Sequence, residues 1–249
     1  MPGSAPPLQE GRHFSVAAEC RQAFGVGGDA WDVTPIGDDA VSVSIADVSG
    51  KGMPAALLMA GFLGSLRGLR PASAGCLAEF AADLSEHLRL ATPETRFVTA
   101  FFGVAEDGIL RYVNAGHEPG LLLPPAGSPE TPRSLPSTGP ALGLLPQARF
   151  REERVPFPPG GSLLLYTDGL TECEDPEGAE MGRDRVGRLA ASLAGALPAT
   201  VVRTLLAAAD SHAAGAPLQD DVTILCLARK DAGAPKAASR GRSSQSTTA

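Results

Sequence analysis

Short apolar runs of strand length recur along the chain, and several are bounded by glycine, aspartate or proline. They predict strands at residues 14–19, 40–46, 97–105, 109–115, 120–123, 150–155, 162–166 and 222–227. From residue 53 to residue 69 the apolar positions instead recur at helical spacing, with Pro54 in the first turn. The same reasoning predicts helices at about 74–90, 183–197 and 198–213.

The order of these elements predicts the fold class. Strands come in clusters and helices come in pairs, which argues against a strict alternation of strand and helix. An α+β domain, with sheets packed together and helix pairs outside, fits this order better. We expect one folded domain over residues 13–230, a flexible segment at 1–12 and a disordered tail at 231–249. The Pro/Gly-rich stretch 123–143 is expected to be a loop inside the domain.

Composition then narrows the class of partner. The net charge of −7 argues against a nucleic-acid partner, which would need a basic face. The longest uncharged stretch, Gly52–Leu66, is too short to span a bilayer, and the first residues lack the apolar core of an export signal. The four cysteines form no Cys-x-x-Cys pair, so we expect reduced thiols in a cytoplasmic protein without a membrane partner. The sequence indicates no oligomeric state.

A Ser-Gly-Lys-Gly turn at 49–52 invites a comparison with nucleotide-binding loops. A P-loop has the pattern G-x-x-x-x-G-K-[ST], with glycine at its first position and a hydroxyl residue at its last. Here Ile45 occupies the first position and Gly52 the last. The turn is therefore not a P-loop.

Aspartates at strand ends are the main candidates for chemistry. They lie in four segments with glycine or small residues nearby, at Asp29 and Asp32, Asp47, Asp168, and Asp220 and Asp221. A single Asp-Gly between strands is most often a turn. Several carboxylates at the edge of a core must be solvated or must neutralise a ligand together, because a buried unpaired charge is costly. Oxygen donors without a Cys/His cluster favour Mg²⁺ or Mn²⁺ over zinc.

Five ordered motifs carry a family resemblance. They are "GGDAWD", "DVSGKGMPAALLMA", "YVNAGHEPGLLL", "LYTDGLTECEDPEG" and "DDVTILCL", and the match runs from about Phe14 to Arg229. In this order they resemble the SpoIIE-like branch of the metal-dependent protein phosphatases, relatives of protein phosphatase 2C. The resemblance implies a four-layer αββα sandwich with two Mn²⁺ or Mg²⁺ ions at one end of the sheets.

The same resemblance implies a ligand set. The metal ligands would be Asp29, Asp47, the backbone carbonyl of Val48, Asp168 and Asp220. Asp221 is the second choice of its pair, because the ligand in the family lies three residues before the threonine, here Thr223. Asp32 would be a structural neighbour of the ligands.

The reaction implied is hydrolysis of phosphoserine or phosphothreonine by a metal-activated water, with no protein nucleophile. The expected partner is a phosphorylated protein, such as an anti-sigma-factor antagonist in a bacterial partner-switching pathway. Two alternatives stay open at this point. One is a non-catalytic regulatory relative of the same fold, and the other is a metal-dependent phosphatase of small phosphate esters.

Four positions near the motifs have open roles. Lys51 replaces a histidine common in the family and would either meet the substrate phosphate or be solvated. His117 is either a general acid or, as we favour, a structural residue of a turn. Ala30 stands where the family usually has an aromatic residue. Arg21 is the nearest candidate for the phosphate-binding arginine of the eukaryotic branch.

Overall fold

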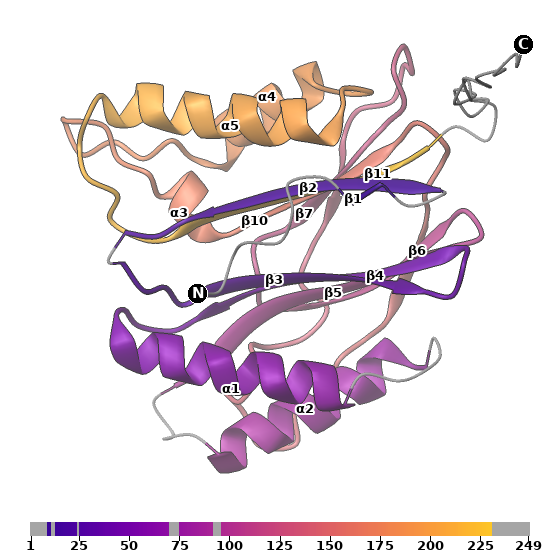
Figure 1. Cartoon of the computed structure of the whole chain (residues 1–249), viewed down its shortest axis with the longest axis vertical. Helices are drawn as coiled ribbons and strands as arrows, with labels where there is room; N and C mark the ends of the chain where they lie inside the picture. Colours follow the sequence, from indigo (N-terminus) through magenta and orange to yellow (C-terminus); the bar gives the residue numbers. More distant parts are fainter. Residues whose placement is uncertain (1–8, 11–12, 24, 70–74, 92–95, 231–249) are drawn as a thin grey trace, which may run out of the picture.

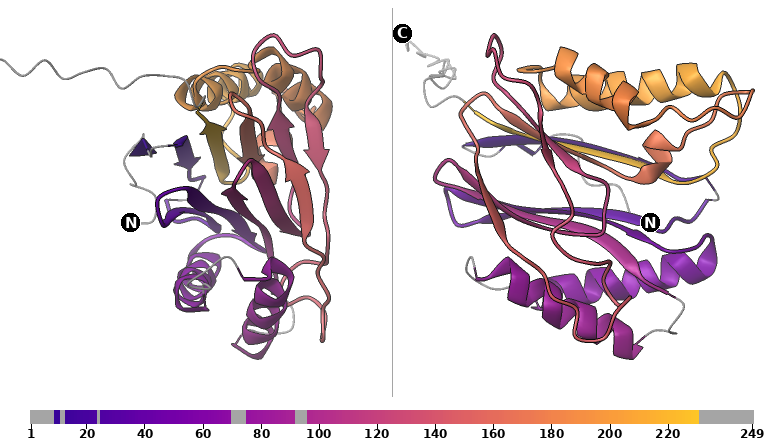
Figure 2. Two further views of the ribbon diagram at one scale, coloured as in Figure 1. Left: turned by 90° about the vertical axis from the view of Figure 1, so that its right-hand side faces the viewer. Right: turned by 180° about the vertical axis from the view of Figure 1, so that it is seen from behind.

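The computed structural model describes residues 9–10, 13–23, 25–69, 75–91 and 96–230. Two antiparallel sheets pack face to face, and a pair of helices covers the outer face of each (Figure 1). The side and rear views show the same four layers (Figure 2). The predicted αββα sandwich is therefore confirmed. Residues 9–10 of the expected flexible segment form a short strand, whereas the expected tail at 231–249 lies outside the described residues.

The first sheet contains the two ends of the domain. Its strand order is β1-β2-β11-β10-β7-β8. The strands are β1 (Gln9–Glu10), β2 (Phe14–Arg21), β7 (Gly120–Leu123), β8 (Arg133–Leu135), β10 (Ser162–Tyr166) and β11 (Val222–Arg229). Strand β8 lies within the stretch 123–143 that was predicted to be a loop. It has only three residues, too few for a hydrophobic pattern to reveal.

The second sheet has the order β3-β4-β5-β6-β9. Its strands are β3 (Asp29–Ile36), β4 (Ala40–Val48), β5 (Val98–Glu106), β6 (Ile109–Ala115) and β9 (Glu153–Pro156). The sequence pattern missed β3, and it placed β9 too early, at 150–155. Strand β3 is an edge strand with Pro35 near its end, and its polar residues hide the alternation.

Helices form the two outer layers. Helices α1 (Met53–Leu69) and α2 (Leu77–Ala91) cover the second sheet, whereas α4 (Arg183–Ser192) and α5 (Pro198–Ala213) cover the first. The bounds of α1 agree with the prediction, because its buried residues Ala55, Met59 and Phe62 follow helical spacing. Helix α4 ends at Ser192, five residues before the predicted end. A four-residue helix, α3 (Asp168–Thr171), follows β10.

Three hydrophobic clusters hold the layers together. One lies between the second sheet and α1 and α2, one between the first sheet and α4 and α5, and one between the two sheets. The central cluster includes Ile45, Phe101 and Leu225, each fully buried. Ala30 packs under the helix pair, whereas Trp31 packs against the central cluster. Among the described residues, no helix has both the length and the apolar character needed to cross a membrane.

Candidate metal centre

Two aspartates face each other across neighbouring strands at one end of the sandwich. Asp29 begins β3 and Asp47 lies at the end of β4, and the two residues are direct partners in the antiparallel register. Each shares a strand face with a residue of the central cluster, Asp29 with Trp31 and Asp47 with Ile45. Both carboxylates therefore face the opposite sheet.

Burial and nearby negative charges raise the pKa values of both carboxyl groups. The pKa of Asp29 lies well above its usual value, first because the residue is buried and then because Asp47 is near. Burial, with Asp168 and Asp220 nearby, raises the pKa of Asp47 to about 7. Such a pair favours a compensating positive charge.

The loop before β3 passes close to this pair at Gly28. A side chain at Gly28 would place its Cβ 3.1 Å from the Val48 carbonyl oxygen and 3.4 Å from Asp47 Oδ1. The two oxygens thus lie side by side next to a residue without a side chain. The predicted carbonyl ligand and the predicted carboxylate ligand are therefore brought together.

The first sheet contributes two more carboxylates. Asp168 follows β10 as the first residue of α3, and Asp220 lies just before β11. Burial and the charge of Asp220 raise the pKa of Asp168. Because both residues also raise the pKa of Asp47, the four predicted carboxylate ligands share one electrostatic neighbourhood.

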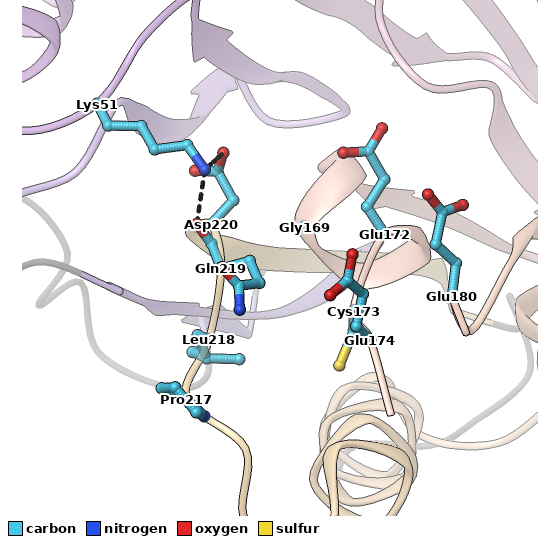
Figure 3. Close-up of a pocket in the computed structure, with 10 residues that line it drawn as sticks. All are labelled: Lys51, Gly169, Glu172, Cys173, Glu174, Glu180, Pro217, Leu218, Gln219 and Asp220. Atoms are coloured by element: carbon cyan, nitrogen blue, oxygen red, sulfur yellow. Dashed lines mark hydrogen bonds and ion pairs between the residues drawn. The ribbon is translucent and has the colours of Figure 1, made fainter. Parts of the chain in front are cut away.

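Lys51 extends from the turn after β4 toward the other sheet (Figure 3). Its ammonium nitrogen lies 3.0 Å from Asp220 Oδ2 and donates a hydrogen bond to the Gln219 carbonyl at 2.6 Å. A positive charge therefore already contacts one of the carboxylates.

Asp221 has a different environment from Asp220. Its side chain is buried, and it accepts hydrogen bonds from the backbone N–H groups of Ala23 and Gly28, each at 2.8 Å. Both donors belong to the connection between β2 and β3. Asp221 therefore stabilises the loop that directly precedes Asp29.

Thr167 is a site residue that the sequence reasoning missed. Its hydroxyl donates to Asp29 Oδ2 at 2.7 Å and accepts from the Thr223 backbone N–H at 3.0 Å. It joins the two sheets beside the carboxylate pair. The only signal in the sequence was its position directly before Asp168.

An acidic cavity opens beside Lys51 and Asp220 (Figure 3). It holds about 100 Å³ and is lined on one side by Glu172, Glu174 and Glu180. The first two glutamates lie in the "TECED" run after α3, which the sequence analysis did not single out as part of the site. The cavity extends the negative potential of the centre outward.

The donor set fits hard divalent cations. Among the described residues, no three His, Cys, Asp or Glu side chains are grouped closely enough to hold an ion as they stand. Like charges that face one another repel, so a looser arrangement is expected without a counter-charge. Carboxylate and carbonyl oxygens from both sheets, with raised pKa values, are nevertheless the donors that Mg²⁺ and Mn²⁺ prefer.

Two of the candidate residues point away from this centre. Arg21 donates to Asp210 of α5 at 2.6 Å and to Glu19 at 3.1 Å. Asp32 accepts hydrogen bonds from Thr34 and from Arg67 of α1. Arg21 is thus engaged by the outer helix layer, and Asp32 lies on the helix side of β3.

His117 is buried between the sheets. Its Nδ1 lies 2.9 Å from the Thr99 hydroxyl, and its backbone N–H donates to the Asn114 side chain at 2.8 Å. Burial lowers the pKa of His117 to about 4. A neutral imidazole keeps one ring N–H but lacks the more acidic second proton of the imidazolium form, so burial favours the structural role of His117 over the general acid.

The low pKa of His117 predicts a pH-dependent stability. The unfolded chain takes up a proton near pH 6.5 and the folded chain only near pH 4. Stability from this residue is complete above pH 6.5 and is lost as the pH falls toward 4, by about 3 kcal/mol. Urea unfolding of wild type and His117→Gln between pH 4 and 7.5 should show this loss in the wild type only. Parallel curves for the two proteins would contradict the assignment.

A protein-family model matches most of this chain. The model described as "Stage II sporulation protein E (SpoIIE)" matches residues 37–230. The chain belongs to the SpoIIE family. The matched residues include four of the five predicted ligand positions, and Asp29 lies just before them.

Curated relatives of this SpoIIE-family chain include two bacterial proteins. Protein IcfG from Synechocystis sp. is 33% identical over 214 residues, which cover 75% of this chain and 33% of that protein. Phosphoserine phosphatase RsbU from Bacillus subtilis is 26% identical over 198 residues, which cover 77% of this chain and 56% of that protein. The chain thus matches about a third to just over half of the length of these relatives.

Solved structures agree with the fold. The RsbU and RsbW domains of Rv1364c from Mycobacterium tuberculosis align over 88% of this chain and 60% of that one, with a TM-score of 0.72 and 25% identity. The SiaA-PP2C domain of Pseudomonas aeruginosa covers 87% of this chain and 86% of its own, with a TM-score of 0.72 and 19% identity. The catalytic domain of the phosphatase PstP, solved with two manganese ions, aligns over 88% of this chain and 99% of its own, with a TM-score of 0.61 and 15% identity.

Proposed function

We propose that this chain is an Mn²⁺- or Mg²⁺-dependent protein phosphatase that hydrolyses phosphoserine or phosphothreonine. The observation that carries the proposal is the carboxylate pair Asp29 and Asp47, which faces Asp168 and Asp220 across the two sheets. Membership of the SpoIIE family, and similarity to a protein named a phosphoserine phosphatase, support the same reaction.

The metal-holding residues would be Asp29, Asp47, Asp168, Asp220 and the Val48 carbonyl, around two ions. Divalent cations bound there supply an activated water and neutralise the phosphoryl oxygens. The structural neighbour PstP, which contains two manganese ions, supports this number.

The chain's own residues have separate tasks in this proposal. Thr167 holds Asp29 through a 2.7 Å hydrogen bond and so orients it. Lys51 sits at the rim of the site, half exposed, where its ammonium can meet a substrate phosphate once Asp220 has another counter-charge. Asp221 keeps the loop before Asp29 closed.

The relatives support a protein substrate. We infer a phosphorylated protein, and among proteins an anti-sigma-factor antagonist of a bacterial partner-switching pathway, acting in the cytoplasm. The similarity to RsbU supports this choice, as does the Rv1364c structure, which joins RsbU and RsbW domains in one chain.

A kinetic comparison tests the substrate class. The values of kcat/KM are measured with Mn²⁺ for a serine-phosphorylated antagonist protein, for a phosphopeptide cut from it, and for para-nitrophenyl phosphate. We expect the protein to exceed the peptide by at least about tenfold, since each 1.4 kcal/mol of docking energy gives a factor of ten. Equal values for protein and peptide would contradict docking, and a preference for the small ester would favour the small-ester alternative. No turnover of any substrate would favour the non-catalytic alternative.

A further inference from the structure

The turn that follows Asp47 and Val48 is held by residues from the start of β5. Ser49 donates its backbone N–H to the Phe97 carbonyl at 3.0 Å. In a regular antiparallel ladder, Phe97 would return this bond to the Ser49 carbonyl. Instead, the Phe97 N–H donates to the Ser49 hydroxyl at 3.0 Å. The ladder therefore ends with the Ser49 carbonyl available to another donor.

Arg96 is that donor. Its guanidinium Nη1 donates to the Ser49 carbonyl at 2.5 Å. The next residue, Gly50, has a φ of 97°, and a side chain there would collide with the same guanidinium nitrogen. Arg96 therefore packs directly on the backbone of the turn, which must carry glycine at this position.

The hydrogen bond from the Ser49 N–H to the Phe97 carbonyl fixes the orientation of the Val48 carbonyl. The peptide between Val48 and Ser49 is planar and trans, so its C=O and N–H point in opposite directions. Because the Ser49 N–H points to Phe97, the Val48 oxygen points the other way. That direction is toward Gly28, beside which Asp47 Oδ1 also lies.

We propose that Arg96 is a positioning residue for the metal centre, which aims the Val48 carbonyl through its bond to Ser49. This inference rests on the proposed function, because the carbonyl has a task only when an ion is bound. Arg96 itself touches neither the carboxylates nor the substrate in this role. It restrains the turn that joins Asp47 to the start of α1.

The test combines Mn²⁺ binding with hydrogen exchange of the metal-free protein. The variants are Arg96→Ala, Arg96→Lys and Arg151→Ala, the last as a control that removes an equal charge from an exposed side chain. We expect Arg96→Ala to bind Mn²⁺ at least about tenfold more weakly in calorimetry, as other groups that orient metal ligands do. Its Ser49 and Gly50 amides should exchange faster without metal, while distant strands stay protected. Arg96→Lys, which can still donate to the carbonyl, should recover part of the affinity, and the control should match wild type.

The outcomes separate this inference from the function on which it rests. Wild-type protein that binds no Mn²⁺ would overturn the proposed function. Wild-type binding together with unchanged affinity and unchanged amide exchange in Arg96→Ala would overturn the positioning role alone. Should the alanine variant fail to fold, Arg96→Gln replaces it, because glutamine removes the guanidinium but keeps a polar side chain. Weakened Mn²⁺ binding with faster exchange at Ser49 and Gly50 in this variant would support the positioning role, and wild-type affinity with wild-type exchange would contradict it.

Discussion

Replacing Asp47 by asparagine is expected to lower phosphoserine turnover by roughly a thousandfold. Metal ions at such a centre contribute several kcal/mol of charge stabilisation, and each 1.36 kcal/mol corresponds to a tenfold change in rate. Asp47 lies among the other predicted ligands, since Asp168 and Asp220, together with Asp221, all raise its pKa. Asp168→Asn should show a loss of similar size.

The same substitution should make the metal-free protein more stable. The pKa of Asp47 rises to about 7 on folding, so its contribution to stability is complete below pH 4 and is lost as the pH rises through 7. At pH 8 the charged residue costs on the order of 4 kcal/mol. Asp47→Asn removes this cost, so in EDTA at pH 8 the variant should unfold at higher urea concentration than wild type.

A matched control lies at the other end of the same hairpin. Asp38 is exposed in the turn between β3 and β4, so Asp38→Asn should leave both turnover and stability close to wild type. An Asp47→Asn protein that kept its activity would contradict the ligand assignment. A variant that was less stable than wild type in EDTA at pH 8 would contradict the electrostatic account.

Substitutions at the adjacent residues Asp220 and Asp221 should differ in effect: the first should lower activity and the second should lower stability. Asp220 is partly exposed and contacts Lys51, so Asp220→Asn should lose activity by about two or more orders of magnitude with little change in stability. Asp221 is buried and accepts two backbone N–H groups. Hydrogen bonds to a charged group contribute about 1.5–3 kcal/mol each, so Asp221→Ala should lower the free energy of unfolding by about 3 kcal/mol or more.

Both variants are measured in the same way, by urea unfolding and by turnover per folded molecule at saturating Mn²⁺. Asp221→Asn, which keeps one acceptor oxygen, should lie between wild type and the alanine variant in stability. It should also retain more activity than Asp220→Asn. Equal losses of turnover at both positions would mean that the register of the ligand was misassigned.

The sequence predicted those helices and strands whose own residues show a regular spacing of apolar positions. Helix α1 was predicted to its observed ends, because its buried residues recur at helical spacing and Pro54 marks its first turn. Strand β3 was missed because it lies at a sheet edge and mixes aspartates and a proline with few apolar residues. Edge strands need less hydrophobic alternation than central ones, so periodicity is a poor guide to them.

The sequence named the aspartates of the candidate site, but neither Thr167 nor the contacts between these residues. Motif order pointed to the aspartates, whereas the pairing of Asp29 with Asp47 depends on a register that no single strand specifies. Asp221 binds the N–H of Gly28, 193 positions away in the chain. Lys51 contacts Asp220 from the opposite sheet. Such contacts arise only when the two sheets pack together, so local patterns do not contain them.

In the proposed function, this chain hydrolyses a phosphoserine protein only with divalent cations at the carboxylate centre. The most direct measurement is phosphate release from serine-phosphorylated casein by exhaustively chelated protein, before and after Mn²⁺ is added. We predict no release above background in chelator and full recovery with Mn²⁺, together with a higher melting temperature, because a ligand that binds only the folded chain stabilises it. Undiminished phosphate release by the chelated protein would contradict the proposed metal dependence.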